Sequence, residues 1–225
     1  MRIKIQIVIV LFFYSSVLYA QSSKNRKIVL QKIDTDSLNV PLDPTYYYFP
    51  INMFVNNNDR NKKLSNFLDR WYSHMLYAMN EPILYNTINN VEVYRFTWLR
   101  RFGNPVSLRI EKNDNTIKLY IKQTDGTGGS EPGNMKLNTV KTLTPEQWEI
   151  FKTKIENIHF WNMPVEEAKE IDTDNSEWIL EGRKNDRYHF VTRTSPHDYN
   201  MKFFRNCCEY LLSLSEINTQ TKNIH

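Results

Sequence analysis

The sequence predicts an α+β domain in which an antiparallel sheet packs against about three helices. Apolar residues alternate with polar ones in several short segments, and they recur at three- and four-residue spacing over longer stretches. These two kinds of segment do not follow one another in a βαβ order. We therefore expect the strands to pair antiparallel, as a meander followed by a C-terminal hairpin.

The first twenty residues have the pattern of a secretory signal peptide. Arg2 and Lys4 precede an uncharged apolar run that extends from Ile7 to Ala20, a small residue suited to cleavage. The run is short for a membrane span, which needs about 20 apolar residues, and an uncleaved anchor is the alternative. No later apolar run approaches that length, so we expect no membrane span after cleavage. The expected location is the periplasm or the extracellular space.

The remaining chain divides by composition into three parts. Residues 21–43 are polar and predict a linker, residues 44–216 predict a single α+β domain, and residues 217–225 predict a polar tail. The aromatic segment that starts at Tyr46 is expected to form an edge strand.

Periodicity places the elements of the domain in order. An apolar stripe predicts a first helix over about 61–79, and Pro82 ends it. Thr144 predicts the start of a second helix, because Gln147 completes a capping box with it. A last helix is expected over about 199–214. The alternating segments that predict strands are 94–98, 106–110, 117–121, 135–141, 178–181 and 188–191.

Residues 126–133 hold four of the six glycines and predict a mobile loop between strands. The loop lacks the spacing of a phosphate-binding or dinucleotide-binding motif. A rim loop is the simpler interpretation, and a ligand-gating loop that uses Gly128 and Gly129 is the alternative.

Charge and histidine spacing favour no cofactor, metal or nucleic-acid site. The formal net charge of +4 falls to +2 without the leader, and no basic stripe interleaved with aromatic residues follows. The five histidines form no i, i+4 pair, so we expect no metal ligands. We also expect no cofactor and no nucleic-acid partner.

The weak catalytic candidates lie on the predicted C-terminal hairpin. Glu181 and Arg183 alternate on one strand, and His189 and Arg193 alternate on the other. A carboxylate across from an imidazole could hold it as a general base, whereas paired surface charges are the structural alternative.

The candidates for a ligand or partner surface are aromatic. Most tryptophans fall on stripes that predict core packing. Trp161 and the run Tyr46, Tyr47 and Tyr48 are less readily assigned to the core, and we expect them to contribute to a binding surface.

Four segments carry a resemblance that covers about half of the chain. They are YRFTWLRRF at 94–102, LTPEQWEIF at 143–151, FWNMP at 160–164 and EWILEGRKNDRYHFVTRTSP at 177–196. Together they resemble an uncharacterised family of bacterial exported proteins. The resemblance implies a single domain and an envelope or extracellular location, and it implies no activity.

The sequence therefore predicts an exported protein of the cell envelope or the medium that acts as a non-catalytic binding or structural module. Its partner would be a protein or a small-molecule ligand. A hydrolase that uses Glu181 and His189 is one alternative, and an inhibitor or immunity-type protein that binds another protein is a second.

Overall fold

The computed structural model describes residues 32–51, 59–86, 91–166, 176–196 and 199–217. The predicted leader, residues 21–31 of the predicted linker and nearly all of the predicted tail lie outside these residues. In the described part of the chain, three α-helices and six strands form an α+β fold, as expected. The helices are α2 (Asp59–Ala78), α3 (Pro145–Asn157) and α4 (Lys202–Ser215). The strands are β1 (Glu92–Leu99), β2 (Val106–Lys112), β3 (Ile117–Thr124), β4 (Met135–Thr142), β5 (Glu177–Lys184) and β6 (Arg187–Thr194).

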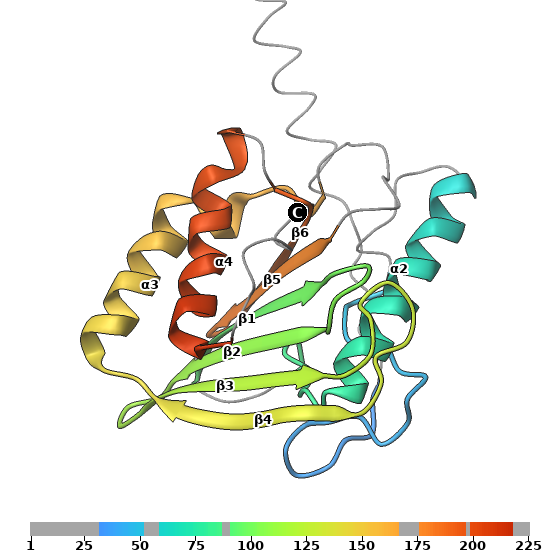
Figure 1. Cartoon of the computed structure of the whole chain (residues 1–225), viewed down its shortest axis with the longest axis horizontal. Coiled ribbons are helices and arrows are strands. Elements are labelled where there is room, and N and C mark those ends of the chain that lie inside the picture. The colour runs from blue at the N-terminus through green and yellow to red at the C-terminus, as the bar shows by residue number, and fades with distance from the viewer. Residues whose placement is uncertain (1–31, 52–58, 87–90, 167–175, 197–198, 218–225) are drawn as a thin grey trace, which may run out of the picture.

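All six strands belong to one antiparallel sheet with the order β4-β3-β2-β1-β5-β6. The meander supplies β1 to β4, and the C-terminal hairpin adds β5 and β6 beside β1. The sheet is open, so β4 and β6 are its edges (Figure 1).

The first face of the sheet packs against α3 and α4, which lie side by side (Figure 1). Tyr94, Phe96 and Trp98 of β1 point into this core, as their alternation predicts. The predicted capping box begins α3, because the Thr144 hydroxyl accepts from the backbone of Gln147 and the Gln147 side chain accepts from the backbone of Thr144.

The second face packs against α2 and the N-terminal segment (Figure 1). Met75 and Leu76 of α2, and Met79 just after it, pack in one core cluster with apolar residues of β1, β5 and β6. Asn80 adopts a left-handed conformation, which lets the chain leave the helix and return over the sheet. The central strands are therefore covered on both faces.

The N-terminal segment differs from the predicted linker and edge strand. Asn39 donates its side-chain amide to the carbonyl of Ile83 at 2.5 Å, and Val40 is buried, so residues 34–42 form part of the folded body. Residues 46–50 form no strand. Their Tyr48 and Phe49 side chains are buried under α2 instead.

Within the described residues, none of the helices has the length and apolar character needed to cross a membrane.

Candidate functional site

The C-terminal hairpin places Glu181 and His189 on opposite faces of the sheet. Glu181 pairs with Phe190, and His189 pairs with Gly182. Residues that pair directly share a face, and successive residues alternate, so Glu181 faces α2 whereas His189 faces α3 and α4. The predicted Glu181/His189 pair does not form, so the hydrolase interpretation loses the geometry on which it depended.

The length of the turn explains this correction. Lys184 pairs with Arg187, which leaves a two-residue turn of Asn185 and Asp186. Asn185 adopts the left-handed conformation that such a turn requires. A shift of one residue in the register would exchange the faces, so the turn length decides which side chains meet.

His189 and Arg193 fasten a loop to the outer strand. The His189 imidazole lies 3.0 Å from the carbonyl oxygen of Met163 and packs against Phe160. Burial lowers the pKa of His189 and outweighs the opposing effect of the Met163 carbonyl. Arg193 donates to the carbonyls of Pro164 and Val165 at 3.1 and 3.2 Å. These two candidates therefore have a structural role.

Glu181 belongs to a buried ionic network on the α2 face. Its carboxylate accepts from the guanidinium of Arg95 at 2.7 Å and from the Tyr188 hydroxyl at 3.0 Å. Arg183 shares this face by strand alternation but is not among the groups bound to Glu181 in these contacts.

The centre of the ionic network is Glu81, which follows α2 and is fully buried. Its carboxylate contacts Arg109 at 2.9 Å, Lys122 at 3.1 Å and Arg95 at 3.4 Å. We define the ionic network as Glu81 and Glu181 with these three cations. The cations come from β1, β2 and β3, so one carboxylate holds the turn after α2 against three neighbouring strands.

The electrostatics of Glu81 follow from these contacts. Burial by itself raises the pKa of a carboxyl group. At Glu81 the three surrounding cations outweigh burial, and the pKa is lowered. Glu81 is therefore an anion at neutral pH, and it compensates charges that would otherwise be buried alone.

The same turn is fixed through its backbone. The carbonyl of Asn80 accepts from Lys122 at 2.6 Å, that of Glu81 from the Tyr48 hydroxyl at 2.8 Å, and that of Pro82 from Arg95 at 2.7 Å. Side chains of the sheet and of the N-terminal segment thus satisfy three successive carbonyls.

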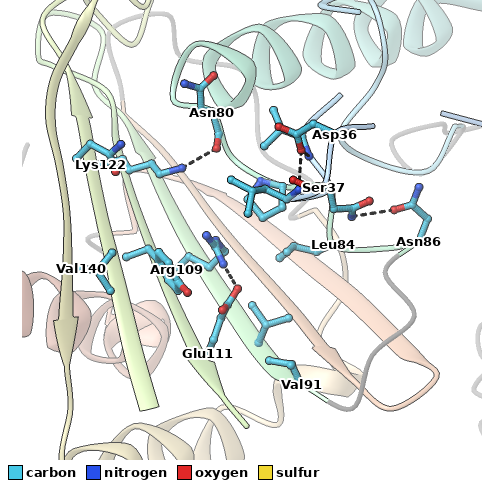
Figure 2. Close-up of a pocket in the computed structure, with 17 residues that line it drawn as sticks. Asp36, Ser37, Asn80, Leu84, Asn86, Val91, Arg109, Glu111, Lys122 and Val140 are labelled. Atoms are coloured by element: carbon cyan, nitrogen blue, oxygen red, sulfur yellow. Dashed lines mark hydrogen bonds and ion pairs between the residues drawn. The ribbon is translucent and has the colours of Figure 1, made fainter. Parts of the chain in front are cut away.

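Beyond this turn, the α2 face is hollowed into a groove of about 880 Å³ (Figure 2). Its walls are residues 36–40 of the N-terminal segment and residues between 80 and 91. Its floor consists of side chains of β1 to β4, among them Arg109 and Lys122 of the ionic network. The volume lies within the range of small-molecule sites, about 300 to 1,000 Å³.

The charges that line the groove are matched. Arg109 is paired with Glu111 on the same strand (Figure 2). It is also paired with Glu81. Lys122 is held by Glu81 and by the backbone of Asn80. Asp36 accepts from the backbone amides of its own turn. The groove therefore presents a polar surface without an uncompensated cation.

The predicted aromatic surface does not exist as one patch. Tyr48 is fully buried and cannot contact a partner, while Tyr46 and Tyr47 are half-buried near α2. Trp161 lies on the other face of the sheet, where it packs against Phe160 and Tyr94.

The glycine loop is held in place rather than free. Gly128 donates its backbone N–H to Gly103 and accepts from the indole of Trp71 at 2.8 Å. A Cβ on Gly128 would lie 2.6 Å from the backbone of Arg100, so only glycine allows this approach. Gly129 also bonds the β1–β2 turn, through Arg101. These contacts anchor the loop to the β1–β2 turn and to α2.

No model of a known protein family matches this chain, and no curated protein matches it either. Among the residues that the structure describes, no group of three or more His, Cys, Asp or Glu side chains could hold a metal ion.

Sequence reasoning missed the ionic network and the groove. Arg95, Arg109 and Lys122 alternate with core residues, and alternation by itself does not show that a second layer covers their face. The available signal was charge of both signs on that one face, together with apolar residues such as Leu99 and Ile179 on the same side. Such a face is typical of a strand covered on both sides.

Proposed function

We propose that this chain is an exported, non-catalytic binding module and that the groove on the α2 face is its ligand site. The observation that carries the proposal is the groove itself, with its floor of Arg109 and Lys122 fixed from behind by Glu81. Side chains that are already held in place lose little freedom when a ligand binds, which favours affinity. The leader-like first twenty residues support export.

The lining of the groove favours an uncharged ligand that is rich in hydroxyl groups. Its two cations, Arg109 and Lys122, are each paired with a carboxylate, and Asp36 is bonded to backbone amides, so a charged ligand would meet no unmatched cation. Asn39, Asn80, Asn86 and Asn138 line it and offer both donors and acceptors. A neutral oligosaccharide has this chemistry, and we propose that class.

Calorimetric titration with neutral oligosaccharides of N-acetylglucosamine and of glucose tests this proposal. We expect Ser37→Trp to abolish binding, because Ser37 is exposed on the groove wall and an indole there would fill the space (Figure 2). Ser213→Trp is the matched control, since Ser213 is exposed on α4 and away from the groove.

Two results would contradict the proposal. Failure of every neutral oligosaccharide to bind the wild-type protein would reject the ligand class. Binding that Ser37→Trp leaves intact would reject the groove as the site.

A second candidate is the inhibitor or immunity-type protein that the sequence also suggested. Phe102 is 80% exposed and Phe67 is 60% exposed. Phe67 packs beside Trp71, which binds the glycine loop, and that loop bonds Arg101 next to Phe102. Exposed aromatic residues beside arginine are typical of protein interfaces. A protein partner would lose affinity with Phe102→Ser and keep it with Ser37→Trp.

A further inference from the structure

The two edge strands of the sheet, β6 and β4, differ in whether other described residues cover their outer side. On the outer side of β6, the Thr192 N–H donates to the carbonyl of Val165 at 2.7 Å, and Arg193 donates to the same carbonyl. Residues 163–165 therefore cover this edge. A covered edge cannot accept another strand.

The outer side of β4 is open among the described residues. Leu143, the residue after β4, donates its N–H to the carbonyl of Ile117 of β3 at 2.9 Å. The backbone groups of Leu143 therefore point toward β3. Because backbone direction alternates along a strand, Asn138, Val140 and Thr142 direct their N–H and C=O groups outward. No described residue bonds these groups.

The usual protections of an open edge are few in β4 and lie mainly at its first residues, where a bulge at Lys136 interrupts the pairing with β3. The strand is eight residues long and contains no proline. Its lysines are tied to the chain itself, Lys136 to Asn104 at 3.2 Å and Lys141 to Glu216 at 2.5 Å. Val140 is 53% exposed. Strand β4 therefore has the features of a strand that pairs.

We propose that β4 pairs antiparallel with β4 of a second copy of this chain, about a two-fold axis at Val140. Outward-pointing residues must face one another for their backbone groups to bond. A register centred on Val140 meets this condition, because it also places Asn138 opposite Thr142 of the copy. Both partners then contribute the same edge, which a two-fold contact requires.

The side chains of β4 are compatible with a second copy as the occupant. In this register Lys141 lies opposite Thr139 of the copy, so no two lysines are directly opposite. The exposed Val140 side chain meets its own copy and leaves water. Asn138 and Val140 also line the groove, so the two grooves would adjoin across the axis. The pairing does not depend on what the groove binds.

Sedimentation equilibrium of the purified protein, as the cell produces it, tests the proposal. We expect the wild-type mass to rise with concentration toward that of a dimer. Val140→Lys and Val140→Glu should each sediment as monomers, because like charges would face one another at the axis. An equimolar mixture of these two variants should restore the dimer. Ile150→Lys is the control, since Ile150 is an exposed apolar residue on α3, and it should dimerise as the wild type does.

Three results would overturn the proposal. They are a wild-type protein that stays monomeric at all concentrations, a Val140→Lys variant that still dimerises, and a mixture of the two charged variants that stays monomeric. Circular dichroism spectra that match the wild type would show that the variants fold.

Discussion

Glu81 is the residue on which the α2 face depends most. Its carboxylate contacts Arg95, Arg109 and Lys122, and its own backbone carbonyl binds Tyr48. A buried ion pair adds little compared with an apolar core, whereas removal of one partner leaves the others uncompensated. The cations of three strands therefore depend on one carboxylate.

We expect Glu81→Gln to lower the free energy of unfolding by about 3 to 5 kcal/mol, because the amide keeps the shape but leaves buried cations without a counter-charge. Urea denaturation measures the change. Glu131→Gln is the control, since Glu131 is exposed and its pairing with His74 is solvent-screened, and it should alter stability by no more than about 0.5 kcal/mol. Equal effects of the two variants would contradict the role assigned to Glu81.

Glu177 is expected to make the free energy of unfolding depend on pH. Burial raises its pKa and outweighs the hydroxyl groups of Thr194 and Tyr72, which donate to the carboxylate at 2.7 and 3.2 Å. A raised folded-state pKa contributes stability that is fully present below the unfolded pKa, about 4.3, and is lost as the pH rises through the folded value.

Glu177→Gln removes this titration. The unfolding free energy of the variant, relative to that of the wild type, should therefore increase between about pH 4 and about pH 8. Urea denaturation at both pH values measures it. If the variant and the wild type differed in unfolding free energy by the same amount at both pH values, the pKa of Glu177 would not be raised.

At the scale of the element, the start of α3 is fixed by its sequence. The reciprocal bonds of Thr144 and Gln147 satisfy backbone donors that the first turn leaves free. We expect Thr144→Ala to lower the free energy of unfolding by about 1 kcal/mol in thermal or chemical denaturation. Thr153→Ala, in the middle of the same helix, should cost nothing, because alanine favours a helix. A loss at Thr153 equal to that at Thr144 would reject the cap as the cause.

The helices and strands could be predicted because each has a local cause. The stripe of α2 and the alternation of β1 depend only on neighbouring residues, and both were confirmed. The site could not be predicted in the same way. The faces of Glu181 and His189 depend on a two-residue turn, and a one-residue error exchanges them.

Whether a second layer covers a face of the sheet also depends on residues far apart in the sequence. Nothing near Arg95 in the sequence shows that Glu81 will return over the sheet to meet it. Alternation alone therefore does not show that this arginine is fully buried. The capping box was found because both of its partners lie within one turn of helix.

At the scale of the whole molecule, the two faces of the sheet are unequally covered. Helices α3 and α4 close the first face. Helix α2 and the N-terminal segment close the second face over β1, β5 and β6, and the groove lies where the floor continues onto β2, β3 and β4 (Figures 1 and 2). This difference gives the molecule a polar groove that borders its open edge strand.

The most direct test of the groove as the ligand site is a nuclear magnetic resonance titration of the protein with a neutral oligosaccharide of N-acetylglucosamine. The account predicts that the backbone amides of Ser37, Asn80, Lys122 and Asn138 shift together and saturate at one dissociation constant. Shifts that cluster instead around Trp161 and His189, on the α3 and α4 face, would contradict it.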